Sequence, residues 1–158
     1  MSAKIRWGVL GVAKIAVEKV IPAMQQGEFA EVTAIASRDA ARAASAAESL
    51  GIAKSYGSYE ELLADPDIDA VYNPLPNHLH VSWSVKAAEA GKHVLCEKPI
   101  ALSSADALEL IEARDRTGVR IQEAFMVRTH PQWLAVRDRV LDGSVGQLLA
   151  AQFIFSYF

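Results

Sequence analysis

The sequence has few of the features that cross-link a protein or bind it to a charged or lipid surface. Cys96 is its single cysteine, which excludes an internal disulfide and leads us to expect a reducing, cytoplasmic compartment. The net charge is only −3 and no block of Lys or Arg occurs, so nucleic acid and anionic membranes are not expected as partners. No apolar run approaches the roughly 18 residues of a membrane-spanning helix. A chain of 158 residues needs no metal to fold, and no metal site is expected.

What the sequence does contain is a regular alternation of apolar runs and amphipathic stretches. The expected strands are residues 5–10, 31–37, 70–73, 93–96 and 120–123, with a short extended piece near Ser55. The expected helices are residues 14–26, 39–50, 79–90 and 103–117, with a further one that starts at Ser58. Strands that alternate with long helices predict βαβ units with right-handed crossovers. We therefore predict an α/β fold over residues 1–124, a Rossmann doubly wound parallel sheet.

Residues 125–158 depart from this alternation. Residues 131–142 predict a helix, and "QLLAAQFIFSYF" is expected to form a strand that runs to the last residue. Phe153, Phe155 and Tyr157 would share one face of that strand, and an aromatic face needs a partner. We expect this segment to begin a second α/β domain, which makes the chain the front portion of a longer protein. An exposed strand of this kind also suggests a homo-oligomer.

The turn from the first expected strand into the first helix, "GVLGVAKIA", matches the dinucleotide fingerprint G-x-G-x-x-G/A with one exception. Gly11 suits the tight turn and Ala16 suits close helix–strand packing, whereas Ala13 replaces the glycine that lets a phosphate approach. The N–H groups at the helix start would hold a pyrophosphate. The residues expected to contact it are Gly11, Val12, Ala13, Lys14 and Ile15. A plain tight turn is the alternative.

The end of the second expected strand predicts which nucleotide binds. An NAD site has Asp or Glu about 20 residues beyond the fingerprint, to hold the ribose hydroxyls. Ser37 and Arg38 occupy that place here. A hydroxyl and a guanidinium suit the 2′-phosphate of NADP, since Arg binds phosphate through paired N–H donors. NADP is the expected cofactor and NAD is possible; alternatively, Arg38 is a solvated residue before Asp39, which caps the next helix.

Polar side chains also follow the strands expected at 70–73 and 93–96. In a doubly wound sheet of order 3-2-1-4-5-6, these strand ends face the nicotinamide half of the cofactor. Asn77 and His80 are three residues apart at a helix start and would share a face toward that half. The cofactor contacts expected from these two strand ends are Leu75, Pro76, Asn77, His80, Glu97 and Lys98. Helix capping is the alternative for Asn77 and His80.

Lys98 is the expected catalytic residue. Pro99 restricts Lys98 to extended geometry, and neighbours in an extended chain point to opposite sides. One of Glu97 and Lys98 is therefore anchored in the protein while the other projects into the crevice. Burial and the positive charge of an oxidised nicotinamide would both favour the neutral amine that a base requires. Lys98 would then take a hydroxyl proton as hydride leaves the same carbon; a solvated lysine is the alternative.

The pieces "WGVLGVAKIA", "IASRD", "LPNHLH", "CEKPIA" and "EAFMVRTHPQW" together resemble the Gfo/Idh/MocA family, the glucose–fructose oxidoreductase and inositol dehydrogenase group. Alanine in the glycine position is similar to the dihydrodiol dehydrogenase and sugar dehydrogenase branches. The resemblance implies a Rossmann domain followed by an α/β domain with a large open sheet, NAD(P) as cofactor and Lys98 as a catalytic residue. It allows a cis peptide before Pro99, and it implies that Arg128 and His130 lie near the cofactor.

The predicted function is an NADP-preferring oxidoreductase that transfers hydride between nicotinamide and a CH–OH group of a sugar, polyol or diol. Family members carry further catalytic residues in the second domain, and no position here corresponds to them. One alternative is therefore a non-catalytic NADP(H)-binding module or an inactive fragment. A second alternative is an S-adenosylmethionine methyltransferase, which expects an acid where this chain has Arg38.

Overall fold

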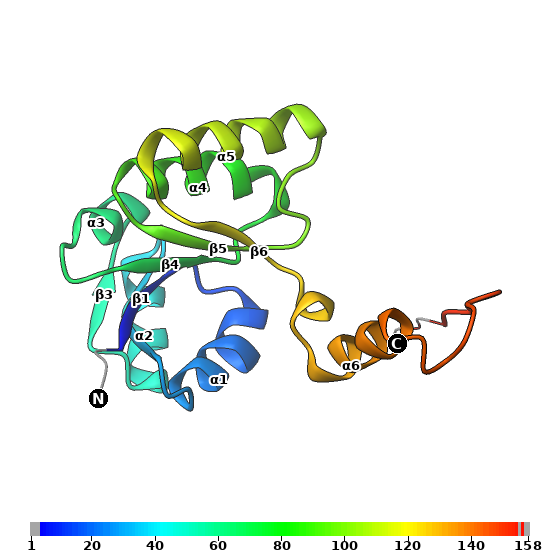
Figure 1. The fold of residues 1–158 in the computed structure, drawn as a ribbon. Coiled ribbons are helices and arrows are strands. Elements are labelled where there is room, and N and C mark those ends of the chain that lie inside the picture. The colour runs from blue at the N-terminus through cyan, green and yellow to red at the C-terminus, as the bar shows by residue number, and fades with distance from the viewer. Residues whose placement is uncertain (1–3, 155, 157–158) are drawn as a thin grey trace. The chain divides into compact units, whose positions relative to one another are not determined.

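The computed structural model describes residues 4–154 and 156, and its centre is a six-stranded parallel sheet (Figure 1). The strands are β1 (Ile5–Leu10), β2 (Ala30–Ala36), β3 (Lys54–Tyr56), β4 (Ala70–Asn73), β5 (His93–Glu97) and β6 (Ile121–Ala124). All neighbouring strands pair in parallel in the order β3-β2-β1-β4-β5-β6. The predicted Rossmann sheet and its strand order are confirmed.

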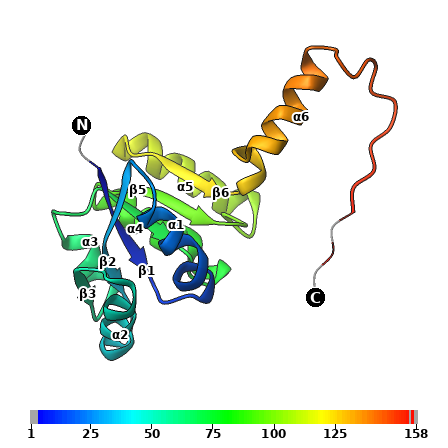
Figure 2. The ribbon, with the colours of Figure 1, turned by 90° about the horizontal axis from the view of Figure 1, so that it is seen from below.

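Helices cover both faces of the sheet, as Figures 1 and 2 show. They are η1 (Ala16–Val20), α1 (Ile21–Gln25), α2 (Ala40–Leu50), α3 (Tyr59–Ala64), η2 (Asn77–Leu79), α4 (His80–Glu89) and α5 (Ser104–Thr117). Two further helices follow β6 in the sequence, η3 (Met126–Arg128) and α6 (Pro131–Leu141). The chain divides into two compact units, Met1–Ala124 and Phe125–Phe158.

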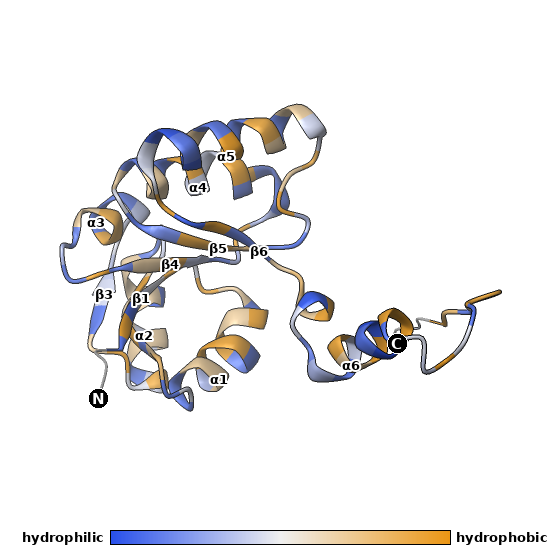
Figure 3. Cartoon of the chain, viewed as in Figure 1, coloured by the Kyte–Doolittle hydropathy of each residue, from blue (hydrophilic) through white to orange (hydrophobic). Residues whose placement is uncertain are grey.

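The core lies in two layers, one on each side of the sheet. Val9 and Tyr72 pack with α2 on one side, whereas Leu10 and Val71 pack with α3 and α4 on the other. These adjacent residues, Val9 and Leu10 in β1 and Val71 and Tyr72 in β4, thus point to opposite faces and are all buried, as expected for a sheet covered on both sides. Figure 3 shows that the edge strand β3 is hydrophilic, which protects that edge from pairing with another chain.

Side-chain caps fix where α3 and α5 begin. The hydroxyl of Ser58 accepts a hydrogen bond from the N–H of Glu61, and that of Ser103 accepts one from the N–H of Asp106. The carboxylate of Glu61 reaches back to the N–H of Gly57, one residue before the one that a standard capping box uses. Both helices therefore start where the sequence predicts.

The helix predicted after β1 contains an irregularity, the π-helical stretch η1. The N–H of Ile21 donates to the carbonyl of Ala16, five residues back. Pro22 follows; it has no N–H, and in a regular α-helix its ring would clash with the carbonyl of Glu18. The wider π turn before Pro22 relieves that clash and lets the helix continue into α1.

The strand predicted for residues 147–158 is wrong for residues 147–154, which have no regular secondary structure. A strand is held by backbone hydrogen bonds to a neighbouring strand, and no described residue of this unit supplies one. The rings of Phe153 and Trp133 lie 6.4 Å apart between centroids. The predicted aromatic face also includes Phe155 and Tyr157, which lie outside the described residues.

An ion-pair network joins β3 to the loop that precedes β4. The ammonium of Lys54 lies 2.9 Å from a carboxylate oxygen of Asp65, and the hydroxyl of Tyr56 donates to the same oxygen at 2.7 Å. The hydrogen bond from Lys54 lowers the pKa of Asp65 to about 2. The hydrogen bond from Arg6 likewise lowers the pKa of Asp69 to about 2. Both carboxylates therefore stabilise the fold in their charged form.

Acidification from pH 4 to pH 2 is expected to lower the free energy of unfolding through this network. Because the pKa values of Asp65 and Asp69 are depressed on folding, their contribution is present above the ordinary value of 3.8 and is lost as pH falls through about 2. Urea unfolding of Asp65→Asn should show a smaller loss over this range than the unmodified chain. Glu112→Gln, which alters an exposed carboxylate on α5, is the control. An unchanged pH dependence in Asp65→Asn would contradict the assignment.

Candidate functional site

The carboxyl ends of the parallel strands bring four loops to one edge of the sheet. These loops follow β1 (residues 11–15), β2 (37–39), β4 (74–79) and β5 (98–103). Every sequence-predicted site residue lies on one of these loops or next to one, except Arg128 and His130, which belong to the second unit. Ligands of doubly wound sheets bind outside this edge, where the strand order reverses between β1 and β4.

The turn after β1 has the geometry of a nucleotide-binding glycine turn. Gly11 has φ +92°, a conformation that favours glycine, and its N–H donates to the carbonyl of Ala36 at 2.8 Å. A Cβ at this position would lie 2.9 Å from Cδ2 of Leu75, whose side chain is buried beneath the turn. Lys14 and Ile15, at the start of the helix, are exposed. The backbone N–H groups at this helix start suit an anion, so the turn fits a pyrophosphate.

Gly11→Ala is expected to destabilise the fold more than Gly51→Ala does. Gly51 also has a positive φ, +65°, but no atom lies within 4 Å of a Cβ built there, so its substitution adds backbone strain alone, about 1–2 kcal/mol. Gly11→Ala adds the clash with Leu75, a further cost of about 1–3 kcal/mol. Urea denaturation measures both variants. Equal losses would show that Leu75 moves aside without cost.

At the end of β2, the two residues that were predicted to bind the 2′-phosphate differ in their exposure to solvent. Ser37 is buried; its N–H donates to the carbonyl of Tyr56, and its hydroxyl accepts from the N–H of Asp39. Arg38 is exposed beside it. Asp39 caps α2 by accepting from the N–H of Arg42. The backbone is thus fixed here, and the side chain of Arg38 extends from the same edge as the glycine turn.

Arg42 is a candidate residue that the sequence analysis missed. Its guanidinium donates to the carbonyl of Val12 at 2.9 Å and so joins the first turn of α2 to the glycine turn. A cation in the first turn of a helix opposes the helix dipole. That unfavourable placement was the signal in the sequence, and it indicates that Arg42 serves something other than helix stability.

The end of β4 is organised by a buried amide. The side-chain nitrogen of Asn73 donates to the carbonyl of His80 and to the hydroxyl of Ser84, both at 3.1 Å. Its oxygen accepts from the N–H of Leu75. Pro76 and Asn77 are exposed on the loop that follows.

His80 does not present its ring to the edge of the sheet. It is 1% exposed, and both ring nitrogens face backbone carbonyls: Nδ1 lies 2.8 Å from that of Pro99 and Nε2 lies 2.7 Å from that of Leu75. This position favours a structural role over the direct cofactor contact that the sequence predicts. Helix capping by Asn77 or His80 is not supported either. The N-cap residues of η2 and α4 are Pro76 and Leu79, and neither side chain makes a capping hydrogen bond.

At the end of β5, Glu97 is anchored and Lys98 is exposed. The buried hydroxyl of Tyr72 donates to the carboxylate of Glu97 at 2.7 Å, and burial followed by this hydrogen bond raises the pKa of Tyr72. The peptide between Lys98 and Pro99 is cis. Burial raises the pKa of the Cys96 thiol to about 12, so Cys96 is a core residue and not a nucleophile. Lys98 is the side chain that this strand end exposes.

Contacts connect the Lys98 turn to the glycine turn. The side chain of Leu75 packs under Gly11, its carbonyl faces the ring of His80, and the same ring faces the carbonyl of Pro99. The turn predicted to bind the pyrophosphate and the turn predicted to face the nicotinamide half therefore lie on the same edge of the sheet. Arg128 belongs to the second unit, so its approach to the cofactor stays a prediction.

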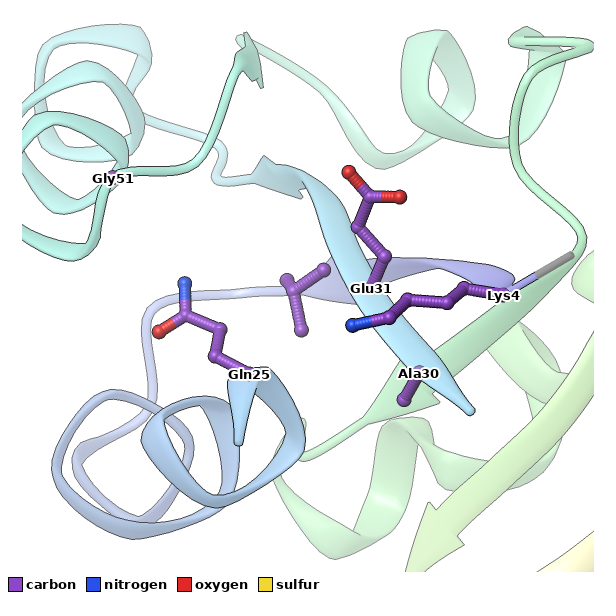
Figure 4. Close-up of a pocket in the computed structure, with 6 residues that line it drawn as sticks. Lys4, Gln25, Ala30, Glu31 and Gly51 are labelled. Atoms are coloured by element: carbon purple, nitrogen blue, oxygen red, sulfur yellow. The ribbon is translucent and has the colours of Figure 1, made fainter. Parts of the chain in front are cut away.

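A hollow of about 510 Å³ lies at the opposite edge of the sheet, near the amino ends of β1 and β2 (Figure 4). Lys4 and Gln25 line it, but their side-chain nitrogens already donate to the carbonyls of Gly27 and Leu50.

In residues 4–154 and 156, no helix has the length and apolar character to cross a membrane, and no cluster of three or more metal-ligating side chains occurs. The carboxyl edge remains the candidate site.

A doubly wound sheet with a glycine turn after β1 and basic side chains after β2 defines a dinucleotide-binding domain. The chain belongs to the GFO_IDH_MocA oxidoreductase family with an NAD-binding Rossmann fold, whose model matches residues 5–125. The resemblance stated from the motifs is confirmed, and membership excludes the methyltransferase alternative.

The relatives of the chain are named as oxidoreductases, and one of them is a D-xylose dehydrogenase. It is 60% identical to an uncharacterized oxidoreductase of Rhizobium meliloti over 96% of this chain and 46% of that protein. It is 53% identical to D-xylose 1-dehydrogenase (NADP(+)) 2 of Haloferax volcanii over 79% of this chain and 38% of that protein. The structure of KijD10, a 3-ketoreductase from Actinomadura kijaniata in complex with NADP, matches with a TM-score of 0.83 and 41% identity, over 91% of this chain and 46% of that one. The chain thus spans less than half the length of these relatives.

Proposed function

We propose that this chain is the cofactor-binding part of an NADP-preferring oxidoreductase that acts on a CH–OH group of a sugar, polyol or diol. The observation that carries the proposal is the position of Lys98, exposed at the carboxyl edge on a turn that is connected to the glycine turn through Leu75 and His80. The relatives support both halves of the proposal, since their names include an NADP-dependent xylose dehydrogenase and a ketoreductase crystallised with NADP.

The residues of the edge fit this cofactor. Gly11 leaves the turn open, and the helix start beyond it offers N–H groups to the pyrophosphate. Arg38 and Arg42 extend from the β2 end, where the adenosine ribose of a Rossmann cofactor lies, and two guanidinium groups suit a 2′-phosphate. The sequence reasoning found one of these arginines, and the structure adds the second.

When bound, the nicotinamide would supply the hydride acceptor or donor. The part of this chain in the reaction is proton transfer: Lys98 would accept the hydroxyl proton of the substrate when the alcohol is oxidised, and return a proton to the carbonyl oxygen in reduction. The anchored carboxylate of Glu97 is held by Tyr72, so it is not the group that moves a proton to substrate.

We further propose that residues 125–158 begin a second α/β domain that binds the substrate and supports a homo-oligomer, in a cytoplasmic protein. The partial coverage of the relatives favours a second candidate for this chain by itself, a module that binds NADP(H) without turnover. In this second candidate the chain would lack substrate binding, whereas all the predicted cofactor contacts except Arg128 lie in residues 4–124.

Fluorescence titration of the chain with NADPH and with NADH tests the nucleotide proposal. We expect NADPH to bind at least roughly tenfold more tightly, since a charge-assisted hydrogen bond contributes about 1.5–3 kcal/mol. The complete protein, with its second domain, should then reduce NADP⁺ with a member of a panel of aldoses, polyols and diols. Binding without turnover in that complete protein would favour the non-catalytic module, and no binding of either nucleotide would refute both candidates.

A further inference from the structure

The turn that carries Lys98 is held at three points. Before it, the carboxylate of Glu97 accepts from the hydroxyl of Tyr72 at 2.7 Å. After it, the N–H of Ile100 donates to the carboxylate of Glu123 at 2.9 Å. Between them, the carbonyl of Pro99 faces Nδ1 of His80 at 2.8 Å. The first and last anchors come from the neighbouring strands β4 and β6, and the middle one comes from α4.

The contact with His80 lies where the backbone ladder of the sheet has ended. Pairing between β4 and β5 stops at Asn73 and Cys96, so no ladder hydrogen bond joins the loop after β4 to the turn after β5. The imidazole ring spans this gap, with one nitrogen toward each loop. A carbonyl oxygen only accepts, so each contact is a hydrogen bond when the facing ring nitrogen carries a proton.

The ring is itself fixed by its surroundings. His80 is 1% exposed, and Asn73 donates to its backbone carbonyl while accepting from the N–H of Leu75. A rigid ring therefore transmits the position of the Leu75 loop, which packs under Gly11, to the turn of Lys98. The ring of His80 thus contacts both the Leu75 loop, which supports the glycine turn, and the turn that carries Lys98.

We propose that His80 is a positioning residue for Lys98: its ring holds the Pro99 carbonyl against the Leu75 loop and so sets the position of the Lys98 amine over the nicotinamide end of the edge. This proposal rests on the proposed role of Lys98 as the proton-transfer residue. If the Lys98 amine were misplaced by about 1 Å, the rate would fall by up to roughly 10²-fold, so the contacts of His80 are expected to matter for catalysis.

The ring protons of His80 provide a test that needs no variant. In a ¹⁵N–¹H spectrum of the unmodified 158-residue chain, we expect a ring N–H of His80 that is protected from exchange with water because it is buried and hydrogen-bonded. The exposed His78, two residues away, should show no protected ring proton. Free exchange at His80 in the folded chain would overturn the proposal.

The second test is kinetic. In the complete protein, His80→Ala is expected to lower kcat roughly 10- to 10²-fold with a change of less than about threefold in the dissociation constant of NADPH. Imidazole in the buffer should restore part of the rate by filling the space left by the buried ring, which general destabilisation would not explain. His78→Ala is the matched control and should leave kcat unchanged.

The outcomes separate this inference from the proposed function. If Lys98→Met lowers the rate but His80→Ala does not, the positioning role is refuted and the role of Lys98 stands. If Lys98→Met leaves the rate unchanged, the proposed function fails, whatever His80 does. If His80→Ala does not fold, free exchange of the His80 ring protons in the unmodified chain would still overturn the proposal.

Discussion

Replacing Lys98 with methionine is expected to lower kcat of the complete protein by roughly 10²–10⁴-fold, the usual contribution of a general acid–base. Methionine is unbranched and long like lysine but carries no titratable group, so the turn between Glu97 and Ile100 should keep its anchors. Affinity for NADPH should stay within about threefold of the unmodified protein, because the phosphates bind at the glycine turn and not at Lys98.

The Lys98→Arg variant distinguishes a requirement for proton transfer at this position from a requirement for positive charge. Arginine keeps a positive charge at the edge but does not release its proton in proteins, so it should be almost as slow as Lys98→Met if Lys98 is the base. Lys19→Met changes an exposed lysine on η1 and is the control for loss of a surface charge. Steady-state rates over a range of pH measure all three. An arginine variant with near-normal rate would mean that the site needs a cation and not a proton-transfer group.

The sequence predicts the sheet well because its signals are local. Apolar runs of four to seven residues mark buried parallel strands, and capping residues such as Ser58 and Ser103 mark helix starts whose hydrogen bonds form within one turn. Pro22 is a local signal of the same kind, because it accounts for the π-helical stretch that precedes it; the sequence analysis did not use it. The strand predicted at 147–158 depends instead on a neighbouring strand, which the local sequence pattern does not reveal.

The sequence predicts which residues of the candidate site lie near one another, but it does not predict which atoms each side chain contacts. Parallel topology alone brings Gly11, Arg38 and Lys98 to one edge, so a fold-level prediction suffices for them. The contacts of His80 and Arg42 join segments that are 19 and 30 residues apart in sequence, and they depend on side-chain directions. No spacing rule encodes those directions, so the sequence did not reveal the contacts of His80 or of Arg42.

Removal of both Arg38 and Arg42 is expected to lower the affinity for NADPH by roughly 10²–10⁴-fold while the affinity for NADH changes much less. Each guanidinium would make charge-assisted hydrogen bonds to the 2′-phosphate, and each is expected to contribute about 1.5–3 kcal/mol. Fluorescence titration of the 158-residue chain with both nucleotides measures the ratio directly. Arg120→Ala, an exposed arginine at the amino end of β6, is the matched control for loss of one positive charge.

The single variants should differ because the two arginines have different contacts. Arg42 donates to the carbonyl of Val12, so Arg42→Ala also loosens the glycine turn and should weaken NADH binding as well as NADPH binding. Arg38 is exposed, and Arg38→Ala should weaken NADPH binding alone and so shift the preference toward NAD. Raising the salt concentration should reduce the affinity for NADPH more than that for NADH, since charges on a surface are screened. A double variant that keeps the NADPH-to-NADH affinity ratio of the unmodified chain would contradict 2′-phosphate binding at this strand end, and Arg38 would then be the solvated residue that precedes the helix cap.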